Sequence, residues 1–459
     1  MSKYDVVIVG GGPGGYVAAI RAAKSGLATA LIEYDELGGT CLNRGCIPSK
    51  TYLKHGEVLE TIQQANQYAI QIDNSRLDMP KVVSRKNNVI KQLNSGIKGL
   101  LRQNKVYVYD GYGYVNEDKS IQIKTESNEK TIYAENIVIA TGSSVAIPPI
   151  EGVEDVPYDT SNTIFNLEEV PESMIIVGGG VIGVEIACAF NVFGTDVTII
   201  EMADRILPLE DEEAAAFLQK ELKDKGIAIH TSSQVTEMRN TGNKQALKVT
   251  RDNQDINLDA DKILMCVGRK PNKTGLDNLA LDYEGPFVKV NKHNGTNIEG
   301  IYAIGDVVGG YQLAHVASEE GIKVVDYILG RKQKSKAFTP RCVYSFPEIA
   351  SVGLTEKEAK AKGIDIAVKK IDLAANGKAI AASENKGFMK IIADKKYNEV
   401  VGVVMVGSHV TEMISQATAT MFLEGTVDEL ASMIFPHPTV SEGLFEAANA
   451  FLDKGIHYT

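Results

Sequence analysis

The chain has 459 residues, of which 44% are hydrophobic and 42 are glycine. This length exceeds what one hydrophobic core supports, so two to four domains are expected, and the composition excludes a disordered protein. The formal net charge of −11, without a basic stripe, argues against nucleic acid as a partner. No apolar run approaches membrane-spanning length and no cleavable leader is visible, which together predict a soluble cytoplasmic protein with no membrane partner.

The chain opens with a glycine corner between a strand and a helix. The apolar run over residues 4–9 predicts a buried parallel strand, and an alanine-rich helix follows over 16–24. Between them lies a G-x-G-x-x-G motif, formed by Gly10, Gly12 and Gly15. Its first glycine makes the turn, the second admits a pyrophosphate and the third lets helix and strand pack closely. The strand over 29–32 then ends at Glu33, an acid placed to accept from an adenosine ribose hydroxyl.

Two cysteines, Cys41 and Cys46, come next, between a glycine pair and Pro-Ser-Lys. Helix positions five apart point away from each other, so a bridge requires a distorted first turn, which Gly45 facilitates. A helix that begins here directs its positive end at the sulfurs and favours the thiolate. The alternatives are two buried free cysteines or half of a zinc site, but no second Cys/His pair follows to complete such a site. We interpret the pair as an exchangeable redox disulfide and expect no metal.

Two helical patterns, over 48–67 and 80–103, separate this pair from the next strands. Alternating segments over 106–115 and 121–125 predict a small antiparallel excursion. A buried strand over 137–143 ends in small residues suited to close approach of a ligand. These residues are Ala140, Thr141 and Gly142.

The strand–glycine–helix–strand pattern recurs over 174–200 and closes at Glu201. The second G-x-G-x-x-G motif consists of Gly178, Gly180 and Gly183. It predicts a second dinucleotide domain. Glu201 favours NAD, because an NADP site requires arginines for the 2′-phosphate and Arg205 is the one cation nearby in the sequence. Glu185, in the first helical turn, is either a surface acid favoured by the helix dipole or a residue that faces the active centre.

The last third of the chain contains a further strand end and then a different kind of domain. Asp306 follows a strand over 301–304 and is either a ligand of a flavin ribityl hydroxyl or a turn aspartate. From about residue 338 the pattern predicts an antiparallel sheet without a glycine corner, with strands over 342–352, 366–373, 387–394 and 400–406. His437 lies between two prolines, with Glu442 nearby. It is either a general base with an orienting carboxylate or a turn histidine.

Taken together, these motifs resemble the flavoprotein pyridine-nucleotide disulfide oxidoreductases over essentially the whole chain. The resemblance implies an α/β fold with two Rossmann-like dinucleotide-binding domains, one for FAD and one for NAD, plus a C-terminal α+β dimerisation domain. It places the FAD-binding domain at 1–145 and the NAD-binding domain at 146–268. The second part of the FAD and central domain then covers 269–337, and the interface domain covers 338–459.

The resemblance also implies roles for individual residues. The first glycine motif with Glu33 matches the FAD site, and the second with Glu201 matches the NAD site. Lys50 matches a lysine beside the flavin and Glu185 its ion-pair partner, which replaces the surface interpretation. His437 and Glu442 match the base and its orienting acid. The further cofactor-binding residues implied are Gly14, Gly39, Thr40, Ala140, Thr141, Gly142, Gly268, Gly305, Asp306 and Ala314.

Within the family, the chain is most similar to the branch that oxidises protein-bound dihydrolipoyl groups with NAD⁺. Glu201, Met202 and Ala203 depart from the arginines that NADPH-dependent glutathione-type reductases carry after this strand, and residues 455–459 lack the cysteines of mercuric reductases. The resemblance implies a homodimer, and as partner a lipoyl-bearing acyltransferase or carrier protein of a multienzyme complex. The alternatives are a glutathione-reductase-like enzyme, an NADH diaphorase or oxidase, and a structural subunit.

Overall fold

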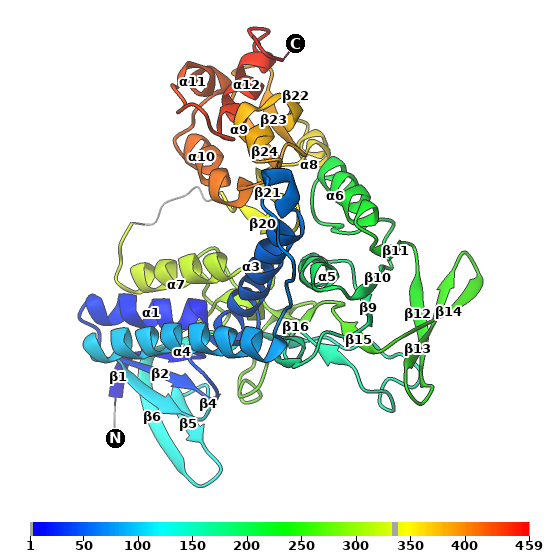
Figure 1. Ribbon diagram of the computed structural model, residues 1–459. Coiled ribbons are helices and arrows are strands. Elements are labelled where there is room, and N and C mark those ends of the chain that lie inside the picture. Colours follow the sequence, from blue (N-terminus) through cyan, green and yellow to red (C-terminus); the bar gives the residue numbers. More distant parts are fainter. Residues whose placement is uncertain (1–2, 333–337, 459) are drawn as a thin grey trace.

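A computed structural model describes residues 3–332 and 338–458. Its strands form three main sheets that helices cover (Figure 1), which confirms the expected α/β class. The predicted domain boundaries stay predictions, and the one between 337 and 338 borders residues outside the described part of the chain.

The first sheet has the strand order β3-β2-β1-β6-β5-β4, with β19 paired to β6. Because β1 is parallel to β2 and β6, the carboxyl ends of these strands meet at one edge. The expected antiparallel excursion holds for β4 and β5, but β3 is parallel to β2. The strands are β1 (Lys3–Val9), β2 (Thr29–Glu33), β3 (Tyr107–Asp110), β4 (Tyr112–Val115), β5 (Ser120–Lys124), β6 (Glu129–Ile139) and β19 (Ile301–Ala303).

Three helices lie side by side on one face of this sheet (Figure 1). They are α1 (Pro13–Lys24), α4 (Met79–Gln103) and α7 (Ala314–Ile328). Two helices follow β2 along the chain, α2 (Gly39–Arg44) and α3 (Cys46–Gln63). The helix predicted over 48–67 therefore begins earlier and ends earlier than expected, and a separate 3₁₀ turn, η1 (Ala65–Tyr68), follows it.

The second sheet is entirely parallel and has the order β11-β10-β9-β15-β8. Its strands are β8 (Asp159–Thr160), β9 (Ser173–Val177), β10 (Asp196–Ile200), β11 (Ala228–His230) and β15 (Lys262–Met265). Helix α5 (Val181–Phe193) is apolar on nearly all sides because it packs both on this sheet and against α3. Sequence patterns had not indicated α6 (Glu212–Asp224) or the antiparallel sheet of β12 (Gln234–Asn240), β13 (Gln245–Arg251) and β14 (Gln254–Ala260).

The third sheet is antiparallel, with the order β20-β21-β24-β23-β22. The single strand expected over 342–352 is wrong: two strands, β20 (Arg341–Val343) and β21 (Glu348–Gly353), flank Pro347, which has no backbone N–H for a sheet ladder. The other strands are β22 (Ile366–Asp372), β23 (Phe388–Asp394) and β24 (Val400–Gly407). The helices of this region are α8 (Glu356–Ala361), α9 (Gly377–Ala381), α10 (Val410–Phe422), α11 (Val427–Ser432) and α12 (Glu442–Phe451).

Candidate active site

A break between two helices brings the cysteine pair together. Cys41 lies in α2 and Cys46 begins α3, with Gly45 between the two helices at φ −129° and ψ −106°. A Cβ on Gly45 would lie 3.1 Å from the Thr40 carbonyl oxygen, so a larger residue would crowd this break. No disulfide bond joins the two cysteines, and their Sγ atoms are 2.6 Å apart. The distorted turn therefore places side by side two sulfurs that a continuous helix would separate.

The two thiols differ in acidity. The hydrogen bond from Cys41 lowers the pKa of Cys46 to about 7, against burial that raises it, and the charge of Lys50 lowers it further. The same hydrogen bond and burial raise the pKa of Cys41. Burial raises the pKa of each remaining thiol to about 12, namely Cys188, Cys266 and Cys342. Cys46 is therefore the more acidic thiol of the pair.

Lys50 and Glu185 form an ion pair that joins α3 to α5. Lys50 lies one helical turn after Cys46, and its Nζ is 2.9 Å from Glu185 Oε1 and 2.8 Å from Oε2. Glu185 is only 4% exposed, so its interpretation as a surface acid is wrong. Tyr344 contacts both partners: its backbone N–H donates to Glu185 Oε1 at 3.2 Å, and its ring centroid is 4.2 Å from Lys50 Nζ.

The glycine corners have no room for side chains at their turns. In the first corner, Gly10 has φ +109° and a Cβ there would lie 2.2 Å from the Ala140 carbonyl oxygen, while a Cβ on Gly15 would lie 1.8 Å from the Gly10 oxygen. In the second corner, Gly178 and Gly183 show the same two close approaches, at 2.4 Å and 2.1 Å. Only glycine fits these positions, because any larger residue would overlap backbone atoms.

Each corner is tied to the acid at the end of the following strand. Glu33 accepts from the Gly11 N–H at 2.7 Å and from the Asp35 N–H at 2.9 Å. Glu201 repeats this geometry, accepting from the N–H groups of Gly179 and Ala203 at 2.6 and 2.7 Å. A carboxylate offers about four acceptor sites, so both acids keep capacity for ribose hydroxyls.

A partly buried arginine links the dithiol segment to the ends of two strands. Arg269 donates from Nε to Ser143 Oγ at 2.7 Å and from Nη2 to Thr40 Oγ1 at 3.4 Å. Its Nε is also 3.9 Å from Asp306 Oδ2, an atom that accepts from Ser143 Oγ at 2.5 Å. Sequence reasoning did not select Arg269, although it directly follows Gly268.

His437 and Glu442 form a pair elsewhere in the chain. The His437 Nδ1 lies 2.9 Å from Glu442 Oε1, and the Thr439 N–H donates to Glu442 Oε2 at 2.8 Å. Burial raises the pKa of Glu442, but these hydrogen bonds and the nearby imidazoles outweigh it and the pKa falls below its usual value. The His437 side chain is 80% exposed. Glu442 begins α12, at the end of the molecule opposite α1 and α4 (Figure 1), so within one chain the pair is remote from the first sheet.

Comparison with known proteins identifies the family. Residues 4–321 match the model described as pyridine nucleotide-disulphide oxidoreductase, and residues 339–448 match the dimerisation domain of that family. The chain belongs to this family. A dihydrolipoyl dehydrogenase of Bacillus subtilis is 42% identical to it over 100% of both chains.

Two solved structures share this architecture. The HOCl-induced flavoprotein disulfide reductase RclA from Escherichia coli matches with a TM-score of 0.86 and 31% identity, covering 97% of this chain and 99% of RclA. LpdA from Mycobacterium tuberculosis matches with a TM-score of 0.90 and 26% identity, covering 98% and 99%. As a pyridine nucleotide-disulphide oxidoreductase, the protein is an oxidoreductase that uses FAD and NAD(H).

The glycine corners fit two dinucleotides. Gly12 and Gly180 are the N-caps of α1 and α5, no side chain caps either helix, and a Cβ on either glycine would meet nothing within 4 Å. The first N–H groups of both helices are therefore accessible to an anion such as a pyrophosphate. Around the first corner the structure gathers predicted residues from four segments. They are Gly14 in α1, Gly39 and Thr40 in α2, Ala140, Thr141 and Gly142 after β6, and Gly305, Asp306 and Ala314 before and in α7.

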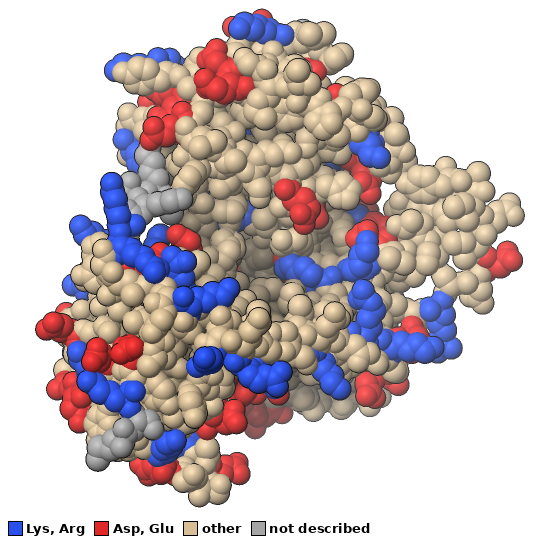
Figure 2. All heavy atoms as spheres, turned by 90° about the vertical axis from the view of Figure 1, so that its left-hand side faces the viewer, with Lys and Arg blue, Asp and Glu red and all other residues tan. Residues whose placement is uncertain are grey.

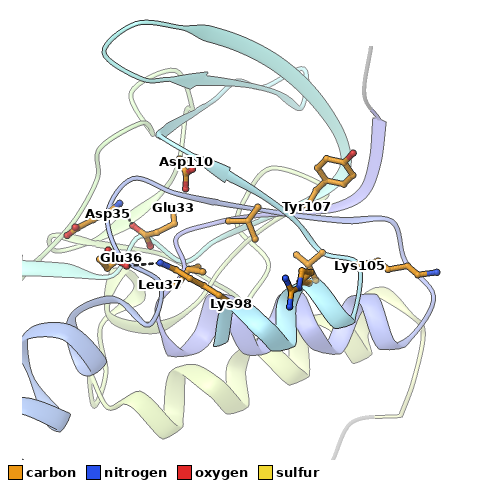
Figure 3. Close-up of a pocket in the computed structure, with 11 residues that line it drawn as sticks. Glu33, Asp35, Glu36, Leu37, Lys98, Lys105, Tyr107 and Asp110 are labelled. Atoms are coloured by element: carbon orange, nitrogen blue, oxygen red, sulfur yellow. Dashed lines mark hydrogen bonds and ion pairs between the residues drawn. The ribbon is translucent and has the colours of Figure 1, made fainter. Parts of the chain in front are cut away.

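A cavity of about 620 Å³ opens on the α4 side of Glu33 (Figure 3). Its lining carries acids after β2 and cations from the end of α4, and Lys98 pairs with Glu36 at 3.3 Å. Tyr107 of β3 also borders it.

Among residues 3–332 and 338–458, no group of three His, Cys, Asp or Glu side chains is arranged to hold a metal ion, and no helix is long and apolar enough to cross a membrane.

Proposed function

We propose that the protein is an NAD-dependent dihydrolipoyl dehydrogenase that oxidises the dihydrolipoyl group of an acyltransferase or carrier protein in a multienzyme complex. The observation that carries this proposal is the Cys41–Cys46 pair with its acidic second thiol, which suits exchange with a small dithiol. The 42% identical relative of Bacillus subtilis supports the choice of substrate.

The surroundings of Glu201 support NAD over NADP. The Arg205 side chain is already engaged, because its Nη2 donates to the Pro208 carbonyl at 3.1 Å and lies 3.7 Å from Glu212. Its Nη1 is 3.5 Å from Asp204. The one arginine near this acid in the sequence is therefore occupied by local partners and is not directed to a 2′-phosphate.

The dithiol chemistry follows from the proposed base and the two cysteines. The Nδ1 of His437 faces Glu442, so Nε2 is the atom that takes a proton from a dihydrolipoyl thiol. The substrate thiolate attacks Cys41 Sγ of the oxidised pair, the Cys41–Cys46 bond breaks and Cys46 leaves as the thiolate. The second substrate sulfur then closes the lipoyl disulfide and releases Cys41. The lower pKa of Cys46 favours this order, because the more acidic thiol leaves faster.

The charge of Lys50 favours the Cys46 thiolate, and Glu185 is proposed to hold Lys50 in position through its two contacts to Nζ. Bound FAD supplies the electron transfer that connects the reduced dithiol to the nicotinamide.

In this proposal His437 of one subunit serves the cysteine pair of the other. Such a homodimer is supported by the match to a dimerisation domain over residues 339–448. It is also supported by highly exposed apolar residues in that range, among them Leu423 and Ile434. In Figure 2, charged side chains are sparse on the upper part of the face shown.

A rate assay tests this proposal. We expect turnover with dihydrolipoamide and NAD⁺, and little with glutathione disulfide and NADPH. His437→Gln should lower the dihydrolipoamide rate by roughly 10²- to 10⁴-fold, which is the usual contribution of a general base, with flavin content retained. His457→Gln is a matched control, because His457 makes a similar 2.7 Å contact to Glu446, one turn along α12.

Two results would contradict the proposal. Undiminished turnover in His437→Gln would remove this residue from the mechanism. A wild-type enzyme that reduces glutathione disulfide with NADPH but does not oxidise dihydrolipoamide would instead be a disulfide reductase of the glutathione type.

A further inference from the structure

Two exposed tyrosines stack beside the acid of the first dinucleotide site. The ring centroids of Tyr34 and Tyr112 are 4.4 Å apart and their planes differ by 16°. The two residues are 49% and 42% exposed, so the stacked pair lies at the surface. Tyr34 directly follows Glu33 at the end of β2, and Tyr112 begins β4.

The packing of β4 fixes this stack close to the site. A Cβ on Gly113 would lie 3.1 Å from a Val9 side-chain atom and 3.3 Å from one of Ile32, so β4 lies directly against the ends of β1 and β2. Glu33 is held in turn by the Gly11 N–H of the glycine corner. In this type of site the pyrophosphate lies at the glycines, the ribose at the acid and the adenine beyond the ribose. The base therefore belongs in the neighbourhood of residue 34.

The second dinucleotide site provides an internal comparison. Glu201 has the same two backbone contacts as Glu33, but the next residue is Met202, whose side chain is 73% exposed. Met202, Ala203 and Asp204 offer no aromatic ring to a base. The two sites therefore share their backbone geometry and differ in the surface presented next to the ribose acid.

We propose that Tyr34 and Tyr112 form an aromatic platform for the adenine of FAD and thereby increase the retention of this cofactor. The proposal rests on the assignment of FAD to the first site. Stacking of a base on an aromatic ring strengthens binding, and this contribution is lost when the ring is replaced by alanine. Tyr112 holds the Tyr34 ring in place before the base arrives, which reduces the entropy lost on binding.

Flavin binding to the full chain tests the proposal without any disulfide substrate. The flavin is removed, and FAD and FMN are titrated separately into wild type, Tyr34→Ala and Tyr34→Phe. We expect the FAD dissociation constant of Tyr34→Ala to rise by on the order of tenfold. FMN has no adenosine, so its dissociation constant should stay unchanged, and Tyr34→Phe should bind FAD like wild type because the ring is retained.

Tyr107→Ala is the matched control, because Tyr107 is 63% exposed and borders the cavity next to Glu33, which Tyr34 and Tyr112 do not line (Figure 3). It should bind FAD like wild type. A loss of FAD affinity in Tyr107→Ala but not in Tyr34→Ala would place the adenine in that cavity and overturn the proposal. Equal weakening of FAD and FMN in Tyr34→Ala, or no change in either, would also overturn it. None of these outcomes depends on which disulfide the enzyme uses.

Discussion

Replacing Cys41 by alanine should shift the ionisation of Cys46 strongly upward. The hydrogen bond from Cys41 is the largest influence that lowers the pKa of Cys46 to about 7 from its ordinary value of about 9. Without this donor, burial still raises the pKa while Lys50 still lowers it, so we expect a pKa near 9 or above. Cys41→Ser keeps a hydroxyl donor next to the sulfur and should therefore show a smaller shift.

The size of the expected rate change determines the choice of assay. At pH ~7.5, a pKa shift from about 7 to about 9 lowers the thiolate population of Cys46 about 25-fold. The less acidic thiolate is however about eightfold more reactive, given a Brønsted coefficient of roughly 0.4–0.5. The alkylation rate at this pH should therefore fall only about threefold. The midpoint of a full pH profile is the decisive measurement, because it follows the pKa alone.

The assay is alkylation of the reduced protein by iodoacetamide between pH 5.5 and 10, with mass-spectrometric quantification of the peptide that contains Cys46. Cys188, Cys266 and Cys342 serve as slow internal references, since burial raises the pKa of each to about 12. A midpoint in Cys41→Ala that stays near 7 would show that Cys41 is not the cause of the acidity. An equal shift in Cys41→Ser would attribute the effect to loss of the thiol itself and not to loss of a hydrogen bond.

Two further substitutions test the stability of the molecule and the first glycine corner. Lys390 is buried and its Nζ lies 2.7 Å from Asp211, so Lys390→Met should lower the urea unfolding free energy at fixed FAD and protein concentration by about 3–5 kcal/mol. Adding Asp211→Asn should recover part of the loss. A loss below about 1 kcal/mol in Lys390→Met would contradict the idea that this substitution leaves Asp211 as a buried, unpaired charge. Gly15→Ala should abolish folding, because its Cβ would overlap the Gly10 oxygen, whereas Gly12→Ala has space to fold but places a methyl where a phosphate would approach. Circular dichroism and flavin content per chain separate the two glycine cases, and full flavin content in Gly12→Ala would refute the assignment of the corner.

The elements that local sequence specifies were predicted well. Both glycine corners depend on a strand, a turn and a helix that are adjacent in the chain, and Gly10 and Gly178 adopt the positive φ angles that glycine accommodates at such a turn. The break at Gly45 was likewise indicated, because the spacing of Cys41 and Cys46 cannot be bridged in a regular helix. In these cases the pattern that predicts the structure lies in residues that are close together in the sequence.

The features that sequence patterns missed depend on contacts between distant segments. Glu185 is buried only because α5 packs against α3, which brings Lys50 to it across 135 positions. Its spacing within α5 shows nothing of this, and only the resemblance to the family indicated the pair. Arg269 contacts Thr40 across 229 positions and Ser143 across 126. The partners of such charged side chains come from distant segments, so local sequence patterns do not reveal their roles.

The duplicated corner also limits what can distinguish the two dinucleotide sites. Glu33 and Glu201 receive matching pairs of backbone N–H groups, so the backbone around each proposed ribose acid gives no basis for different affinities. In the proposed reaction FAD stays bound while NAD exchanges, which requires different affinities. The difference therefore has to come from side chains outside the shared motif. Next to Glu33 those side chains are a stacked pair of aromatic rings, and next to Glu201 they are an exposed methionine and an arginine bound to its own loop.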